Sequence, residues 1–111
     1  MKIKERIEGD VVVLVISGKM MGGPETLEIQ EKVKGLLSDD LKKFVFDLSS
    51  VKWMNSSGLG SLISAHTSIK NAEGNLKLAG ASEKVQSIFI VTQLLQVFDT
   101  YETVDRALAN F

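Results

Sequence analysis

Two adjacent serines, Ser56 and Ser57, are the residues whose types and spacing could do chemistry in this chain. They lie in the stretch WMNSSGLG, residues 53–60, just downstream of an apolar run. A serine hydroxyl can act as a nucleophile, cap a helix or accept a phosphoryl group. Each of these roles makes a different demand on the residues around it.

A hydrolytic role lacks the residues it needs. The nucleophile elbow has the order Gly-x-Ser-x-Gly, whereas Gly58 and Gly60 both follow the serines here. A catalytic serine also needs a base, and His66 is the sole histidine. His66 falls on an apolar helical stripe, which predicts a core or boundary position. We therefore expect that the chain is not an enzyme.

Cofactor and metal sites also lack their sequence patterns. Gly58-Leu59-Gly60 has no third glycine of a dinucleotide fingerprint, and no Gly-Lys-Ser or Gly-Lys-Thr of a phosphate loop occurs. Acids and histidine show no metal-ligand spacing, and the chain contains no cysteine. We expect neither a cofactor nor a metal ion.

Composition narrows the class of protein. The 111 residues carry 13 basic and 14 acidic side chains, well mixed along the chain. This balance predicts neither a nucleic-acid partner nor insertion into a membrane. The longest apolar run, residues 11–16, is too short to cross a bilayer, and the N-terminus lacks the apolar core of a signal peptide. We expect one cytoplasmic domain over residues 1–111.

The spacing of apolar residues predicts an α/β fold with about five strands and about four helices. Apolar and β-branched runs predict strands at residues 3–7, 11–17, 44–48, 76–79 and 97–100. Helical periodicity predicts helices that begin near Pro24, Ser56 or Ser57, Ser82 and Glu102. Strand and helix alternate through the second half, which favours a mixed, mostly parallel sheet.

Several side chains and turns within these elements have expected positions. The run 44–48 is apolar almost throughout, so we expect a strand covered on both faces. The glycines in residues 18–23 predict a bend, and Gly74 is expected to adopt a left-handed conformation at a helix end. One buried stripe is expected on the second helix, formed by Leu59, Leu62, Ile63, His66 and Ile69.

The serine pair is expected at the start of this second helix. Asn55 or Ser56 suits the N-cap, and Gly58 and Gly60 allow a tight turn or the close approach of another surface. One interpretation is a capped helix start with no further role. The other is a phosphorylation site, because a helix N-terminus favours an added anion while a closing partner surface is repelled by it.

The segment FDLSSVKWMNSSGLGSLI, residues 46–63, resembles the signature of the STAS domain, in particular that of bacterial anti-sigma-factor antagonists. Asp47 matches the acid at the strand end, Ser56 the phosphorylatable serine, and residues 57–60 the rest of the motif. The order of the elements and the loop SGKMMGGPE extend the resemblance over essentially the whole chain.

This resemblance implies partner switching. The unphosphorylated antagonist binds an anti-sigma factor that is a serine kinase, and phosphorylation of Ser56 by that kinase releases it. A serine phosphatase then resets the cycle. The domain is the substrate and ligand of this system and not its catalyst. The residues implied at the partner-binding surface are Met20, Met21, Asn55, Ser57, Gly58, Leu59 and Gly60.

Two departures from the family pattern fall on this surface. Asn55 replaces the acid that precedes the phosphorylatable serine, and Met20 and Met21 stand where relatives often carry an acid. Exposed methionines suit an adaptable protein surface, and methionines packed against the core are the alternative. Because aspartate is also a good N-cap, Asn55→Asp is expected to change stability little.

A second functional class stays open beside partner switching. A STAS module that is never phosphorylated could act as a scaffold or an adaptor, for instance beside a transport ATPase. A neighbouring kinase or phosphatase gene would favour switching, whereas a transporter operon would favour the adaptor. A third class, a hydrolase of unfamiliar type, requires a general base that the sequence does not offer.

Overall fold

A five-stranded sheet forms the centre of the computed structural model, which describes residues 1–111 apart from the side chain of Glu25. The strands lie side by side in chain order: β1 (Lys2–Glu8), β2 (Val11–Met20), β3 (Lys43–Met54), β4 (Asn75–Ala79) and β5 (Asp99–Tyr101). β1 pairs with β2 antiparallel, and the other neighbours are parallel. The predicted mixed, mostly parallel sheet is confirmed.

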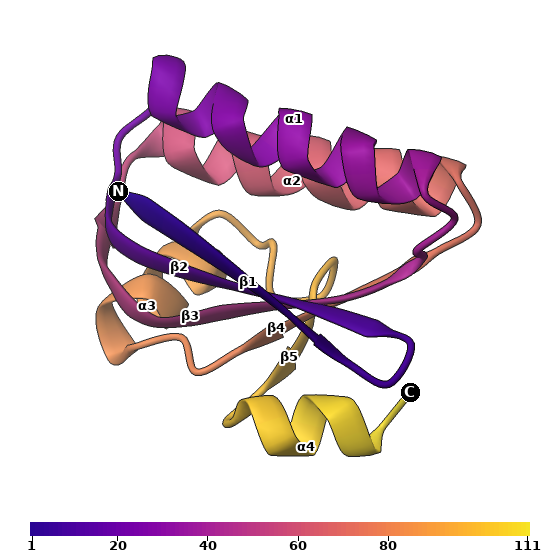
Figure 1. Cartoon of the computed structure of the whole chain (residues 1–111). Helices are drawn as coiled ribbons and strands as arrows, with labels where there is room; N and C mark the ends of the chain where they lie inside the picture. The colour runs from indigo at the N-terminus through magenta and orange to yellow at the C-terminus, as the bar shows by residue number, and fades with distance from the viewer.

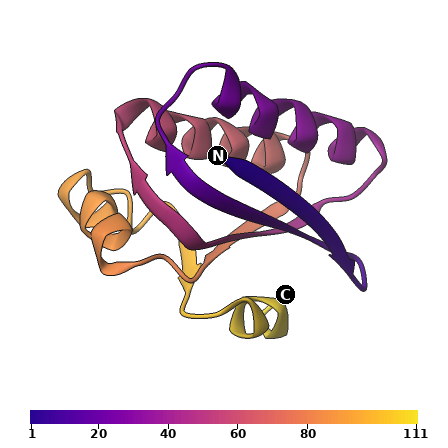
Figure 2. The same cartoon turned by 60° about the vertical axis from the view of Figure 1, so that its left-hand side comes forward.

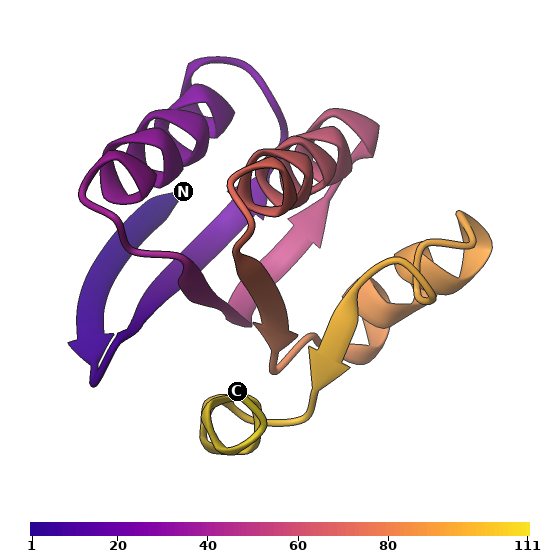
Figure 3. The ribbon, with the colours of Figure 1, turned by 90° about the vertical axis from the view of Figure 1, so that its right-hand side faces the viewer.

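The helices cover the sheet unequally. They are α1 (Pro24–Ser38), α2 (Ser56–Asn71), α3 (Glu83–Val91) and α4 (Val104–Ala109). α1 and α2 lie side by side on one face, α4 lies on the other, and α3 sits toward the β5 edge (Figures 1 and 3). The predicted starts at Pro24, Ser56 and Ser82 are within one residue. The last helix begins two residues after Glu102 because Thr103 caps it by accepting from the Arg106 backbone N–H at 3.1 Å.

The hydrophobic core has one part on each face of the sheet. Phe44 and Phe46 belong to the larger part, beneath α1 and α2, together with residues of α3. Val45 belongs to the smaller part, which packs against Ala107 of α4. β3 is therefore buried on both faces, as its continuous apolar run predicted. Figure 2 shows the same layering from an oblique direction.

β2 and β3 are longer than the sequence predicted. β2 continues past residue 17 through Gly18 to Met20, and β3 continues past residue 48 to Met54. The prediction missed these ends because exposed polar residues interrupt the apolar runs there. The predicted bend at residues 18–23 is confined to residues 21–23, between the end of β2 and the start of α1. Gly18 (φ 97°) lies at a shift in the β2–β3 register.

Two local predictions on α2 need correction. Of its expected buried stripe, Leu59, Leu62 and Ile69 are buried, but Ile63 is 37% exposed because it lies on the flank of the helix. Gly74 does not adopt the left-handed conformation, which is taken by Glu73 at φ 63°. Glycine is needed at 74 because a β-carbon there would overlap the carbonyl oxygen of Lys42.

A buried lysine ties the last strand to the sheet. Lys77 of β4 donates hydrogen bonds to the Asp99 carboxylate and, at 3.3 Å, to the Tyr101 hydroxyl. Its ammonium also lies 4.8 Å from the centre of the Phe111 ring. Burial lowers the pKa of Lys77, but the hydrogen bonds and the charge of Asp99 outweigh this effect and raise it. Lys77 therefore remains charged in this partly buried cluster.

Candidate functional site: the N-terminus of α2

Asn55 is the N-cap of α2. Its backbone is extended (φ −96°, ψ −175°), and its side-chain oxygen accepts a hydrogen bond from the Gly58 N–H at 2.9 Å. Of the two expected caps, the structure selects Asn55. Ser56 and Ser57 occupy the first two helical positions, and both are exposed. Neither serine is needed to begin the helix.

The same asparagine also holds the end of β2. Its side-chain nitrogen donates to the Met21 carbonyl oxygen at 2.8 Å, and its backbone N–H donates to the Met20 carbonyl oxygen at 3.1 Å. An aspartate could replace the cap but not the amide donor. The structure therefore gives a reason to expect a larger loss of stability in Asn55→Asp than capping alone predicts, because a carboxylate would face the Met21 carbonyl.

The two glycines of the motif have different surroundings. Gly58 is buried, and a β-carbon on it would overlap the Met20 carbonyl oxygen and lie 2.9 Å from the Met20 β-carbon. A β-carbon on Gly60 would meet open space. The close approach that these glycines suggested therefore involves only Gly58, and the approaching surface is the end of β2 in the same chain.

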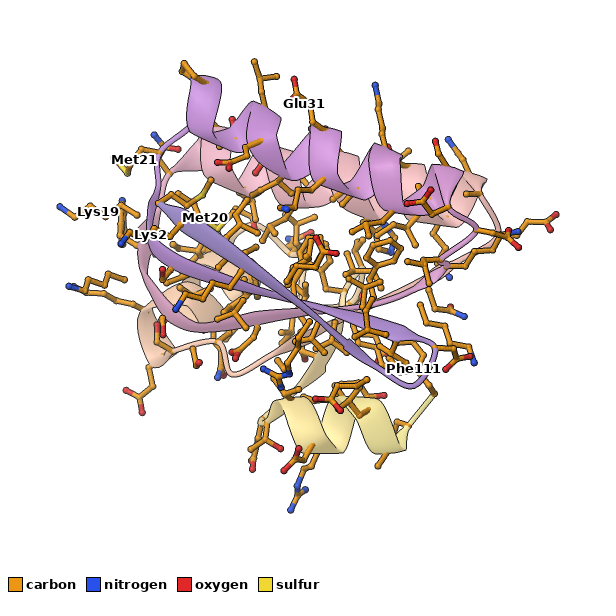
Figure 4. The ribbon with its side chains drawn as sticks, in the orientation of Figure 1. Lys2, Lys19, Met20, Met21, Glu31 and Phe111 are labelled. Carbon is orange, nitrogen blue, oxygen red and sulfur yellow. The ribbon has the colours of Figure 1, made fainter. Side chains whose placement is uncertain are left out.

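The two methionines point in opposite directions. Met20 is fully buried and pairs across the sheet with buried Met54, whereas Met21 is 46% exposed. Figure 4 shows Met20 within the core and Met21 at the edge near the start of α2. The Met20 side chain, like that of buried Leu59, cannot contact a partner on this surface. Met20 ends β2 with its side chain in the core, and Leu59 lies on the buried side of α2, so only Met21 of these three side chains is exposed to a partner. The partner-binding role of this surface stays a prediction.

The two serines also differ in what lies beside them. Gly22, with a φ of 91°, passes so close to Ser57 that a β-carbon on it would lie 2.5 Å from the Ser57 β-carbon. Ser57 is thus flanked by the β2–α1 loop. Ser56 is exposed at the first position of α2, where no acid occupies the first turn. A group added to the Ser56 oxygen would meet the positive end of the helix.

Asp47 forms hydrogen bonds within β3 and lies far from the serine pair. Its Oδ1 accepts hydrogen bonds from the Ser49 N–H at 3.0 Å and from the Ser49 hydroxyl at 2.7 Å. Asp47 lies seven positions before Met54, which ends β3. At the usual rise per residue this spans more than about 20 Å, so Asp47 does not reach Ser56.

His66 is a packed residue, as its place on the stripe predicted. Its ring meets Phe98 edge to face with the centroids 5.6 Å apart. It lies ten positions after Ser56 along α2, a rise of about 15 Å. It therefore cannot act as a base for either serine. The described side chains contain no cluster of acids or histidines that could hold a metal, and no described helix is long and apolar enough to span a membrane.

One known protein family matches nearly the whole chain, including the segment with the two serines. The model of the STAS domain matches residues 2–107. The chain belongs to the STAS domain family. The match spans the sheet, the α2 N-terminus and most of α4, so this STAS domain carries its motif in the setting that the sequence suggested.

Solved structures share the fold at low sequence identity. TM1081 of Thermotoga maritima is 24% identical with a TM-score of 0.85, covering 97% of this chain and 92% of its own. The unphosphorylated form of the Bacillus anti-sigma factor antagonist SpoIIAA is 16% identical with a TM-score of 0.82, covering 98% and 95%. A sulfate transporter family protein from Wolinella succinogenes is 18% identical with a TM-score of 0.76, covering 95% and 87%.

Proposed function

We propose that this STAS domain is an anti-sigma-factor antagonist that works by partner switching. In the unphosphorylated form it binds an anti-sigma factor that is also a serine kinase, and phosphorylation of Ser56 releases it. A serine phosphatase restores the binding form. The domain takes part as ligand and substrate, in the cytoplasm, and carries out no catalysis of its own.

The observation that carries this proposal is the position of Ser56. It is exposed at the first turn of α2, and Asn55 already caps the helix through Gly58. The Ser56 hydroxyl is thus left for another use, and the N–H groups of the first turn favour an added phosphate. SpoIIAA, which has the same fold, has been solved in unphosphorylated and phosphorylated forms.

An unphosphorylated adaptor remains the second candidate, and one observation favours it. The same fold occurs in a sulfate transporter family protein, so a domain of this fold can also belong to a transport protein. In such a role Asn55 and its contacts with the β2 end would be structural only. Binding would then be independent of the chemical state of Ser56.

The two candidates differ in one experiment. Tagged wild-type domain and Ser56→Asp are used to isolate partners from the native host, and each partner is identified by mass spectrometry. A kinase recovered with the wild type is purified and incubated with the domain, ATP and Mg²⁺. We expect phosphate on Ser56, retained in Ser57→Ala and absent from Ser56→Ala. Phosphate on another residue, or recovery of the same transport subunit by wild type and Ser56→Asp, would contradict switching.

A further inference from the structure

An apolar groove opens on the surface between the end of β3 and α3. Trp53, Ile88 and Val91 form its apolar lining, and its volume is about 300 Å³. The remaining lining residues are Lys84, Ser87 and Thr92. Trp53 is 39% exposed and Val91 81% exposed, so the groove forms part of an exposed apolar patch. We call this feature the Trp53 groove.

The core uses only one of these three apolar side chains: Ile88 is partly buried and packs against it, whereas Trp53 and Val91 are exposed. α3 is held to the core by Val85 and Phe89, which are both fully buried, and the side of the helix with Val91 faces outward. Trp53 lies on the opposite face of β3 from buried Met54. Contiguous exposed apolar side chains that the core does not use mark interaction sites.

Three lysines lie in or next to the Trp53 groove. Lys84 lines it, Lys52 precedes Trp53, and Lys19 is the residue paired with Trp53 in the β2–β3 ladder. All three lysines are exposed, and none forms an ion pair with a described residue. Figure 4 shows the Lys19 side chain projecting outward from the molecule. The three positive charges near the groove contrast with the net charge of the whole chain, which is −1.

We propose that the Trp53 groove binds an amphipathic helix of a protein partner, with the apolar side of that helix in the groove and acidic residues beside the three lysines. An apolar groove of this kind accepts the apolar stripe of a helix, and flanking charges select the partner. Trp53 comes three residues before Ser56, so the bound helix lies next to the start of α2. The proposal rests on the proposed function only in taking the ligand to be a protein.

A lipid surface fits the same residues less well. Each lysine near an anionic membrane adds about 1 kcal/mol, and stable anchoring needs two strong signals. Three lysines in or near the groove, on a chain without a cysteine that could carry a lipid chain, fall short of that requirement. A protein helix fills the groove with side chains, which a lipid headgroup layer does not.

The test uses defined peptides and the only tryptophan of the chain as a reporter. The probe is a synthetic peptide of about 16 residues, with leucine on one helical face and glutamate flanking it. A control peptide has the same sequence with lysine in place of each glutamate. Binding is followed by Trp53 fluorescence and by NMR shifts of the labelled domain. We expect shifts centred on Trp53, Ile88 and Val91, with the acidic peptide bound at least about tenfold more tightly than the basic one.

Variants of the domain sharpen this test. Val91→Asp should abolish binding of the acidic peptide, whereas Ile7→Asp, at an exposed apolar position on β1 near the opposite end of β2, should not. Lys84→Glu should reduce the preference for the acidic peptide. Equal binding of both peptides, or shifts centred away from the groove, would overturn the proposal.

Two other occupants have distinct outcomes. Binding to phosphatidylglycerol vesicles without binding of either peptide would assign the groove to a membrane. Concentration-dependent dimers that Val91→Asp removes would assign it to a second copy of the chain. Either result overturns the proposal. Ser56→Ala, which removes the phosphorylatable hydroxyl without adding a charge, should leave peptide binding unchanged, so a failure of the switch at Ser56 and a failure of the groove are separately visible.

Discussion

The side-chain amide of Asn55 joins two segments that are 34 residues apart, because its nitrogen donates to the Met21 carbonyl oxygen at 2.8 Å. The oxygen of the same amide caps α2 at Gly58. One side chain therefore positions the β2–α1 loop against the helix that begins with Ser56. Only a group with both a donor and an acceptor can do this, which explains asparagine at a position where the family pattern has an acid.

Asn55→Asp should therefore destabilise the domain. The cap is kept, but the donor to Met21 is lost and a carboxylate faces a carbonyl oxygen, so the free energy of unfolding should fall by about 1–3 kcal/mol. Denaturant unfolding measures this change. Asn55→Ser is the control, because a hydroxyl keeps the cap without the repulsion and should cost less. A wild-type unfolding midpoint in Asn55→Asp would contradict the role of the amide.

The two glycines of the motif should respond oppositely to alanine. Gly58→Ala places a methyl group against the Met20 carbonyl oxygen and should lower the free energy of unfolding by about 1–3 kcal/mol or more. Gly60→Ala meets open space inside a helix and should raise it by about 0.5–1 kcal/mol. Thermal and denaturant unfolding of the two variants measure both values. Similar effects of the same sign would show that helix propensity, and not the contact with β2, decides at these positions.

Phosphorylation of Ser56 should weaken partner binding strongly and stability hardly at all. A doubly charged group brought into the interface costs about 2–5 kcal/mol, which lowers affinity by roughly 30-fold or more. The helix N-terminus offsets the charge within the domain by about 0.3–1 kcal/mol. Calorimetry with the purified partner measures the first effect, and thermal unfolding the second. Equal affinity of the phosphorylated and unmodified forms would contradict partner switching and favour the role of an unphosphorylated adaptor.

Stability should decline mildly between neutral and slightly acidic pH because of His66. Burial against Phe98, and then the charge of Lys70, lower the pKa of His66 below its usual 6.5 in the folded domain. Protons therefore bind the unfolded chain more readily, so stability is highest above the unfolded pKa and falls as the pH drops toward the folded one. His66→Gln should flatten this part of the profile of melting temperature against pH. An unchanged profile would assign the decline to other groups.

The sequence alone determined the fold class and the place of the site. Apolar periodicity is a local property, since a strand repeats every two residues and a helix every 3.6, and it located most of the elements. The start of α2 was equally local, because capping depends on residues within one turn of Asn55. The ends of β2 and β3 were missed because paired but exposed residues such as Lys19 and Ser50 leave no apolar pattern.

The tertiary structure decided what each residue of the site does. That Met20 is buried and Met21 exposed, that Gly58 leaves room for a carbonyl and that Asn55 needs its amide all depend on where the end of β2 meets α2. The exposure of Trp53 likewise depends on which side of α3 turns to the core. These contacts join segments that are distant in the chain, and no local spacing encodes them, because they arise only when the sheet and its helices pack together.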